Sequence, residues 1–426
     1  MPTSKQKSKT PISKKQSKMT ASKPLQYPSL KTVLQYIEPN LRFKLVLHIP
    51  SIRTTEKAVP LKIAKLEFEE NSISVNGSEY SFQVFVQFEE ERPPLEVNHG
   101  IDFDFDNSGL PDYASKNRLL PGDIRFERKQ QVPNENSLRA EVDQYLSRLA
   151  NKKTQTSSLN SFFQFLEDSI LESRKQLMFY DFQRMNRGPS FNCFMHLTMN
   201  KWVVYRTPYK NNLALAMKSL VQFILGNRSE VVQVKDFVIE TPILRWPQTP
   251  IQLKIYSLQV DSLKNVNTDQ LTSTFHPSSF PLANITLKNP RATAKDLDLK
   301  TIHEAKKVTI TYSHFSQWLP IFRILKNSRV VIEYSDNLDE LTELIKMMME
   351  LRKPIGTWYT FEMVSKPIER KILTWAKRRP ELIEASTRTV KLSTKHDSAL
   401  IVSFNNTTYG KFAGTLELKI VSLTEI

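Results

Sequence analysis

The chain has 426 residues, enough for two or three domains of about 150 residues each. Its 60 Lys and Arg exceed its 44 Asp and Glu, and seven of the Lys lie among the first 23 residues, which contain no acidic residue. One Cys and nine Gly exclude an internal disulfide framework, Cys-based zinc and iron–sulfur sites, and glycine-rich nucleotide-binding loops, so we expect no cofactor.

Residues 1–24 form a tail rich in Lys, Ser and Thr, and this composition predicts disorder. We interpret the tail as a solvated leader, and the alternative is a weak nuclear-localisation or nucleic-acid contact at Lys14, Lys15 and Lys18. The sequence has neither the apolar core of a secretory signal nor a run of about 20 apolar residues. We therefore expect a protein of the cytoplasm, the nucleus or both, with no membrane partner.

Residues 25–88 are predicted to form three short helices followed by a small β-meander. Pro39, Pro50 and Pro60 separate the helices, and Asn76-Gly77 supplies the positive φ angles of a tight hairpin. The apolar side chains at helical spacing are Leu30, Val33, Leu34 and Ile37 in the first helix and Leu41, Leu45 and Ile49 in the second.

The next two segments are predicted to connect this module to the rest of the chain. Residues 89–134 are interpreted as an acidic loop or linker, because eight acidic residues and only one Arg lie between Glu89 and Asp112. Residues 135–188 are interpreted as a helical connector with helices at 135–150 and 158–185.

Residues 189–426 alternate predicted strands with predicted helices, and a pair of apolar residues recurs within the strands. The pairs are Leu258/Val260, Ile285/Leu287, Val308/Ile310, Val330/Ile332 and Val390/Leu392. Their spacing predicts a leucine-rich-repeat-like α/β domain, best matched at Ile255-x-x-Leu258-x-Val260, although the characteristic Asn is missing. The alternative is an ordinary open α/β sheet, and both interpretations require parallel strands. A closing antiparallel hairpin at 399–405 and 414–421 is expected to cap the sheet edge.

Motifs for catalysis or metal binding are incomplete. Asp102, Asp104 and Asp106 alternate with Phe as in some calcium loops and phosphatase motifs, but Asn107 stands where a calcium loop needs Gly, and Asp106 stands where the phosphatase motif needs Thr or Val. The seven His lack metal-ligand spacing, and Cys193 lies in an apolar run typical of an inert buried thiol. We therefore expect no enzyme activity, no catalytic residues and no metal site.

The segment 366–379 is predicted to be a helix with a basic face formed by Arg370, Lys371, Lys377, Arg378 and Arg379. Such a face is usually solvated. Together with the basic tail, it also supports an alternative function, in which the chain binds nucleic acid through phosphate contacts.

The stretch Val33-Leu34-Gln35-Tyr36-Ile37-Glu38-Pro39 resembles the centre of F-box motifs. The wider pattern from Tyr27 to Gly77, together with Leu225-Gly226-Asn227-Arg228-Ser229, is similar to the nematode F-box C family, which pairs an F-box-like module with a domain of unknown function. The resemblance implies a non-catalytic substrate-recognition adaptor that docks on the linker subunit of a cullin-type ubiquitin ligase. The residues it implies for docking are Leu30, Val33, Leu34, Ile37, Pro39, Leu41 and Leu45.

An adaptor also needs a surface for its protein target, whose identity the sequence does not give. In a repeat-like domain, the strand positions between the buried pairs point away from the helices and are available for contact. These positions are Gln259, Thr286, Thr309 and Val331, and we expect them to form the target-binding row.

Overall fold

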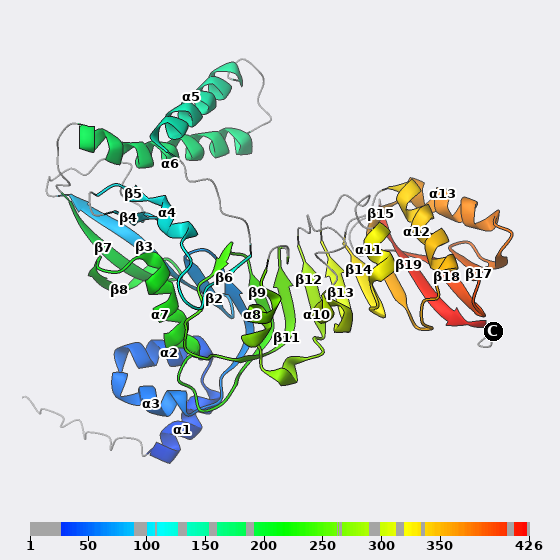
Figure 1. Cartoon of the computed structure of the whole chain (residues 1–426), viewed down its shortest axis with the longest axis horizontal. Helices are drawn as coiled ribbons and strands as arrows, with labels where there is room; N and C mark the ends of the chain where they lie inside the picture. Colours follow the sequence, from blue (N-terminus) through cyan, green and yellow to red (C-terminus); the bar gives the residue numbers. More distant parts are fainter. Residues whose placement is uncertain are drawn as a thin grey trace, which may run out of the picture.

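The computed structural model describes residues 27–88, 100–106, 109–126, 134–152, 160–184, 191–261, 263, 266–288, 299–311, 319–333, 337–406 and 413–423. Most of these residues belong to one extended α/β arrangement built on a 15-stranded mixed sheet. Figure 1 shows the sheet running along the molecule, with a helical module at one end and a separate pair of helices beside the same end. The predicted tail at 1–24 lies outside the described residues.

The N-terminal module contains α1 (Tyr27–Tyr36), α2 (Pro39–His48), the short 3₁₀ turn η1 (Pro50–Ile52) and α3 (Arg53–Lys57). Pro39 begins α2, and the Glu38 side chain caps it by accepting a 3.1 Å hydrogen bond from the Leu41 amide. The apolar residues at helical spacing do not form the buried face of α2: Leu41 and Ile49 are exposed, whereas Phe43 and Val46 are buried.

Polar side chains on α2 explain this difference. Asn40 is buried because its amide donates to the Val75 carbonyl at 2.9 Å and accepts from the Tyr80 hydroxyl at 3.0 Å. A buried polar group with both kinds of partner loses little by leaving water. The inner face of α2 is therefore partly polar, and apolar periodicity alone does not identify it.

The meander contains β1 (Lys62–Phe68), β2 (Ser72–Val75) and β3 (Ser78–Phe88), and the turn between β2 and β3 has positive φ at Asn76 and Gly77, as predicted. β1 also pairs in parallel with β9 (Val232–Ile239), and β3 pairs with β7 (Phe191–Met199), which is followed by β8 (Trp202–Pro208). The meander therefore belongs to the same sheet as the C-terminal region, instead of forming a separate unit that ends at residue 88.

The acidic-loop prediction for 89–134 is wrong for the described part, 100–106 and 109–126. This part contains β4 (Asp104–Phe105), β5 (Pro111–Asp112), α4 (Tyr113–Asn117) and β6 (Ile124–Arg125). Phe103 and Tyr113 are buried in a second core with Phe179 from the helical connector. That connector consists of α5 (Glu135–Lys152) and α6 (Asn160–Arg184), close to the predicted helices.

The region from α7 to β15 has parallel strands in consecutive order, and the predicted strands are confirmed there. The sheet order β9, β11, β12, β13, β14, β15 follows the chain, and each neighbouring pair is parallel. All four predicted apolar pairs from Leu258/Val260 to Val330/Ile332 are buried. The bounds are α7 (Leu213–Leu225), β10 (Ile243–Leu244), β11 (Leu253–Val260), α8 (Thr268–Ser273), η3 (Pro277–Ser279), β12 (Asn284–Leu287), α10 (Lys300–Glu304), β13 (Lys307–Ile310), α11 (Leu319–Ile324), β14 (Arg329–Ile332), α12 (Leu338–Glu350) and β15 (Trp358–Ser365).

A third buried position precedes each apolar pair by three residues, as in Ile255-x-x-Leu258-x-Val260. Leu282 and Ala305 occupy it before β12 and β13, and Asn327 occupies it before β14. The Asn327 amide donates to the carbonyls of Ile302 at 2.6 Å and Ala305 at 2.7 Å, in the turn of the preceding unit. This side chain therefore joins two successive strand–helix units and satisfies backbone groups that are buried between them.

After α13 (Lys366–Lys377) the chain forms four antiparallel strands, β16 (Leu382–Ala385), β17 (Thr389–Ser393), β18 (Ser398–Asn406) and β19 (Ala413–Ser422). The predicted β18–β19 hairpin is confirmed. Its predicted place at the sheet edge is wrong, because β19 pairs with β15 and the edge strands of the main sheet are β16 and β8. No helix in the described part of the chain is long and apolar enough to cross a membrane.

Candidate interaction surfaces

The predicted docking residues of the helical module differ in their exposure. Leu34 is buried, so it belongs to the module's own core and is unavailable to a partner in this conformation. Val33 and Leu41 are exposed, and the remaining members, Leu30, Ile37, Pro39 and Leu45, are partly exposed. Six of the seven predicted side chains therefore reach the surface of one small helical module.

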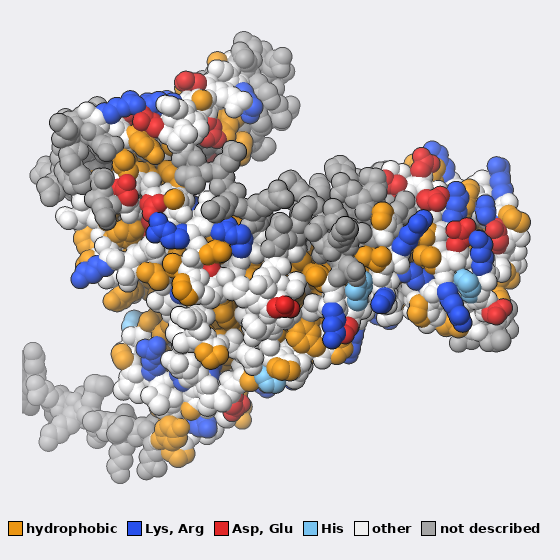
Figure 2. Space-filling view, in the orientation of Figure 1, with side chains coloured by type: hydrophobic (Ala, Val, Ile, Leu, Met, Phe, Trp, Pro, Cys, Tyr) orange, Lys and Arg blue, Asp and Glu red, His pale blue; other side chains and the backbone are white. Residues whose placement is uncertain are grey.

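Sequence reasoning did not select the most exposed apolar side chain of this module. Tyr36 is 86 % exposed, and Tyr27, Leu47 and Ile49 are exposed as well. Figure 2 shows hydrophobic side chains at the surface over α1. Tyr36 lies inside the F-box-like stretch 33–39, which was the signal that could have identified it. These side chains lie on α1, on α2 and just after α2. Exposed apolar side chains that gather on one small part of a protein surface are typical of protein–protein contacts.

A buried ion triad fixes the module to the rest of the fold. The Glu56 carboxylate on α3 accepts hydrogen bonds from Arg42 on α2 at 2.8 Å and from Arg228, just after α7, at 3.0 Å. The side chains of all three residues are about 2 % exposed. Arg42 also donates to the Pro60 carbonyl at 2.9 Å, and Arg228 donates to the Ile224 carbonyl at 2.9 Å. This network ties the helical module to α7.

Lys57 adds a second link between the module and α7. Its ammonium group donates to the carbonyls of Phe223 and Ile224, in the last turn of α7. Burial, followed by the positive charge of Arg228, lowers the pKa of Lys57 to about 7. The ordinary pKa of Lys is about 10.4, so the unfolded chain binds more protons than the folded chain above pH 7.

This pKa shift predicts that the free energy of unfolding rises as the pH increases from about 7 to 8.5. The contribution is lost as the pH falls through the folded-state pKa of Lys57. Urea unfolding at several pH values should show the slope, and Lys57→Met should reduce it. The control is Lys44→Met, because Lys44 is an exposed lysine on α2 and its replacement should leave the slope unchanged. An unchanged slope in Lys57→Met would contradict the prediction.

The predicted target-binding row is aligned in register across the sheet. Gln259 pairs with Thr286, Thr286 with Thr309, and Thr309 with Val331. Thr286 and Thr309 are nevertheless buried, and Asn284 joins them by accepting from Thr309 at 3.1 Å and donating to Thr286 at 2.9 Å. The prediction that all four positions are free for contact is therefore wrong for these two, and only Gln259 and Val331 are partly accessible.

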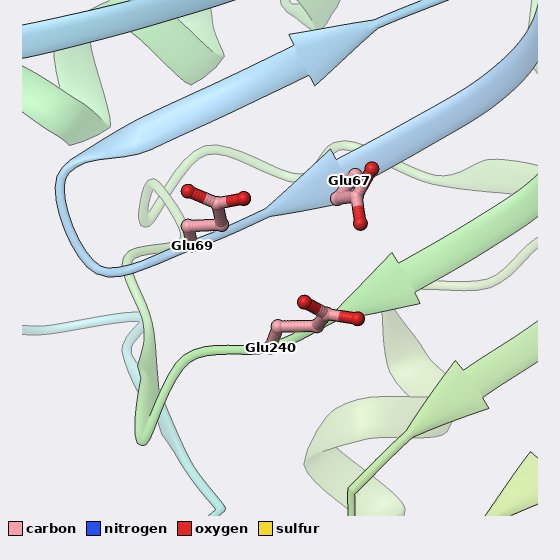
Figure 3. A group of neighbouring side chains, drawn as sticks. All are labelled: Glu67, Glu69 and Glu240. Carbon is pink, nitrogen blue, oxygen red and sulfur yellow. The ribbon is translucent and has the colours of Figure 1, made fainter. Parts of the chain in front are cut away.

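Three carboxylates cluster at the ends of β1 and β9. Figure 3 shows Glu67, Glu69 and Glu240, whose oxygens lie within 4.8 Å of one another. Lys65 pairs with Glu67 at 2.7 Å, and Lys288 pairs with Glu240. These two cations neutralise much of the cluster's charge, and exposed carboxylates at this spacing are also common where no metal binds.

The Asp102–Asp106 segment performs structural roles. The buried Asp104 carboxylate accepts from the Tyr209 hydroxyl and from the Leu213 amide, both at 2.8 Å, at the start of α7. Asp102 pairs with Lys116 at 3.4 Å, and Asp106 accepts from the Leu110 amide at 2.9 Å. Each carboxylate therefore already holds a local partner, which favours neither the calcium nor the phosphatase interpretation.

Cys193 is partly buried on β7, and burial raises the pKa of its thiol to about 11. A thiol with this pKa is protonated near neutral pH and is a weak nucleophile. His196 lies three residues after Cys193 on the same strand. Its ring stacks on Phe85 with ring centroids 3.9 Å apart, and burial lowers the pKa of His196. The His–aromatic stack accounts for the position of this His within the sheet.

The predicted basic helix is α13. Arg370, Lys371, Lys377 and Arg378 are exposed on it, whereas Arg379 lies over the Trp375 ring at 5.5 Å and pairs with Glu381 at 2.9 Å. The opposite side of α13 buries Ile368, Ile372 and Leu373. In Figure 2, basic and acidic side chains are intermixed over this C-terminal end of the molecule.

A family described as a domain of unknown function (DUF3557) matches residues 212–365. No curated protein and no solved structure matches the chain. The matched residues run from α7 to β15 and include Arg228, which holds the helical module. The match therefore covers the consecutive parallel strands and the contact to the module, and its description assigns no activity.

Proposed function

We propose that the chain is a non-catalytic adaptor of a cullin-type ubiquitin ligase. In this proposal, α1 and α2 dock on the linker subunit, and the leucine-rich-repeat-like sheet binds a protein target. The observation that carries the proposal is the pairing of an exposed apolar surface, which includes Val33, Tyr36 and Leu41, with a buried ion triad that fixes its module to the sheet. An adaptor needs this arrangement, because it must hold two partners at a defined separation.

The docking surface predicts a large loss of linker-subunit binding in the full-length double variant Val33→Asp/Leu41→Asp. The affinity should fall by more than about tenfold, because two carboxylates would be desolvated in an apolar interface without partners. Biolayer interferometry with the purified linker subunit measures this loss directly.

A matched control exists on the same chain. Val231 and Leu215 are 39 % and 42 % exposed, close to Val33 at 44 % and Leu41 at 50 %, and they lie outside the module. Val231→Asp/Leu215→Asp should bind the linker subunit as tightly as the unchanged chain. Equal binding by both double variants, or no binding by the unchanged chain, would contradict the proposal.

A second candidate function is nucleic-acid binding, favoured by Arg370, Lys371, Lys377 and Arg378 on α13. In the described part of the chain, none of these four cations pairs with a carboxylate. Phosphate contacts would make the affinity fall steeply with salt concentration. Absence of salt-dependent binding to single-stranded DNA and RNA would remove this candidate.

A further inference from the structure

The strands β14, β15, β19, β18 and β17 lie side by side in the sheet, and in the described part of the chain helices pack against one of their two faces. Along these strands, alternate side chains such as Val330, Tyr359 and Leu418 are buried. That buried face packs against helices, since α13 contacts β15, β17 and β19, and α12 contacts β18. The side chains between the buried ones point to the opposite face, where most are at least partly accessible, although Ala399 and Val421 are buried.

Strand register assembles a row of basic residues on this open face. Lys307 pairs with Arg329, Arg329 with Trp358, and Trp358 with Lys419. The row continues from Lys419 through Ile401 to Lys391. We name Lys307, Arg329, Trp358, Lys419 and Lys391 the basic stripe. The stripe crosses β13, β14, β15, β19, β18 and β17, in this order, at the C-terminal end of the molecule in Figure 1.

The cations of the basic stripe lack acidic partners. In the described part of the chain, none of Lys307, Arg329, Lys391 and Lys419 forms an ion pair. The Arg329 guanidinium lies 5.0 Å from the centroid of the Trp358 ring, so this aromatic side chain holds one cation of the stripe in place. The stripe therefore combines four cations that form no ion pair within the described residues with an aromatic side chain at its centre, and Glu384 lies opposite Lys391 on β16.

Acidic residues lie beside the stripe on the same face. Glu417 is two residues before Lys419 on β19, and Glu333 and Glu362 follow the ends of the paired segments of β14 and β15. Burial and the negative charge of Glu362 raise the pKa of Glu333, whereas the positive charges of Lys307 and Lys288 act in the opposite direction. Along the strands, at ~3.3 Å per residue, Glu417 lies roughly 7 Å from the stripe, whereas Glu333 and Glu362 lie roughly 13 Å from it.

We propose that the basic stripe binds an acidic, extended segment of a protein, with an apolar side chain of that segment against Trp358. This inference rests on the proposed function, because it names the chemistry of the target that the sheet would recognise. A protein segment fits better than a nucleic acid. A uniformly negative polymer lying across the face would meet Glu417, Glu333 and Glu362, whereas a peptide can place its acidic residues over the stripe alone.

The test measures binding of a fluorescein-labelled peptide, with three Glu on each side of a central Leu, to the full-length chain by fluorescence anisotropy at ~50 mM salt, where charge attraction is weakly screened. All proteins compared carry Gln at the seven Lys of the tail, so that the tail adds no cationic background: Lys5, Lys7, Lys9, Lys14, Lys15, Lys18 and Lys23. The test variant is Arg329→Glu/Lys419→Glu. The matched control is Arg323→Glu/Lys326→Glu, which makes the same charge change on two exposed residues, one on α11 and one just after it.

The affinity for the labelled peptide should fall at least about tenfold in Arg329→Glu/Lys419→Glu and less than about twofold in the control, because the repulsion acts at the contact itself. Circular dichroism should show both variants folded, as expected for substitutions of exposed side chains. Equal losses in the two variants, or no binding by the parent chain, would overturn the proposal.

Oligothymidylate of ten nucleotides serves as the competing ligand. Tighter binding of the oligonucleotide than of the peptide, lost in Arg329→Glu/Lys419→Glu, would identify the stripe as a nucleic-acid site and overturn the proposal. The measurement contains no linker subunit. Failure of the stripe therefore leaves the docking surface on α1 and α2 untouched, and failure of linker binding leaves the peptide result standing.

Discussion

Replacing Glu56 with Ala should lower the free energy of unfolding by about 3–5 kcal/mol, because it leaves two buried guanidinium groups without their shared carboxylate. Arg42 and Arg228 would keep hydrogen bonds to backbone carbonyls, but the negative charge that offsets their desolvation would be gone. The loss should also loosen the helical module, since Arg228 is its ionic connection to the segment after α7.

Urea unfolding of the full-length chain measures this loss. The control is Glu343→Ala, which removes an exposed carboxylate that pairs with Lys346 at 3.2 Å. Exposed pairs contribute little, so the control should change the free energy of unfolding by less than about 1 kcal/mol. Similar stability in the two variants would show that the Glu56 triad does not hold the module.

Replacing Asp123 with Asn should cost a comparable amount, about 3–5 kcal/mol. The fully buried Asp123 carboxylate pairs with Arg245 at 2.7 Å and with Lys218 at 2.8 Å. Asn preserves the shape of the side chain and removes its charge, so the loss isolates the electrostatic contribution. The segment before β6 would then lose its strongest attachment to α7 and to the chain after β10.

Thermal unfolding by circular dichroism is the appropriate measurement for Asp123→Asn. Asp143→Asn is the control, because Asp143 is exposed on α5. A surface change of this kind usually alters stability by less than about 0.5 kcal/mol. If the two variants melted at the same temperature, the buried Asp123 cluster would not contribute to stability as described.

The regular part of the fold was predictable from the sequence because each parallel strand buries the same small pattern. Leu258/Val260 and Val330/Ile332 mark two of these strands, and the intervening helices follow from apolar residues at helical spacing. The membership of β1 in the sheet was missed, although Ile63-x-x-Leu66-x-Phe68 has the same spacing. Its partner β9 lies far away in the chain, and periodicity gives no information about which distant strands pair.

Buried charge was the main feature that sequence reasoning could not identify. Asp104 lies in the acidic stretch 89–112 and Asp123 in the same predicted loop, 89–134, where composition predicts solvation. Their burial depends on Leu213, Lys218 and Arg245, about one hundred residues later in the chain. Only the tertiary fold brings these donors to the carboxylates.

The same limit applies to the candidate surfaces. The register of Gln259, Thr286, Thr309 and Val331 could be predicted from the apolar pairs, but the burial of the two Thr could not. The basic stripe was not predictable, because it depends on antiparallel pairing of β19 with β15 and β18. Lys419 gives no local signal that it lies beside Trp358.

Hydrogen–deuterium exchange of the full-length chain, with and without saturating linker subunit, tests the adaptor account most directly. The account predicts slower exchange in α1 and α2 when the linker subunit is present, together with unchanged exchange along the strands from β11 to β19. No change in α1 and α2, or protection confined to the open face of the sheet, would contradict it.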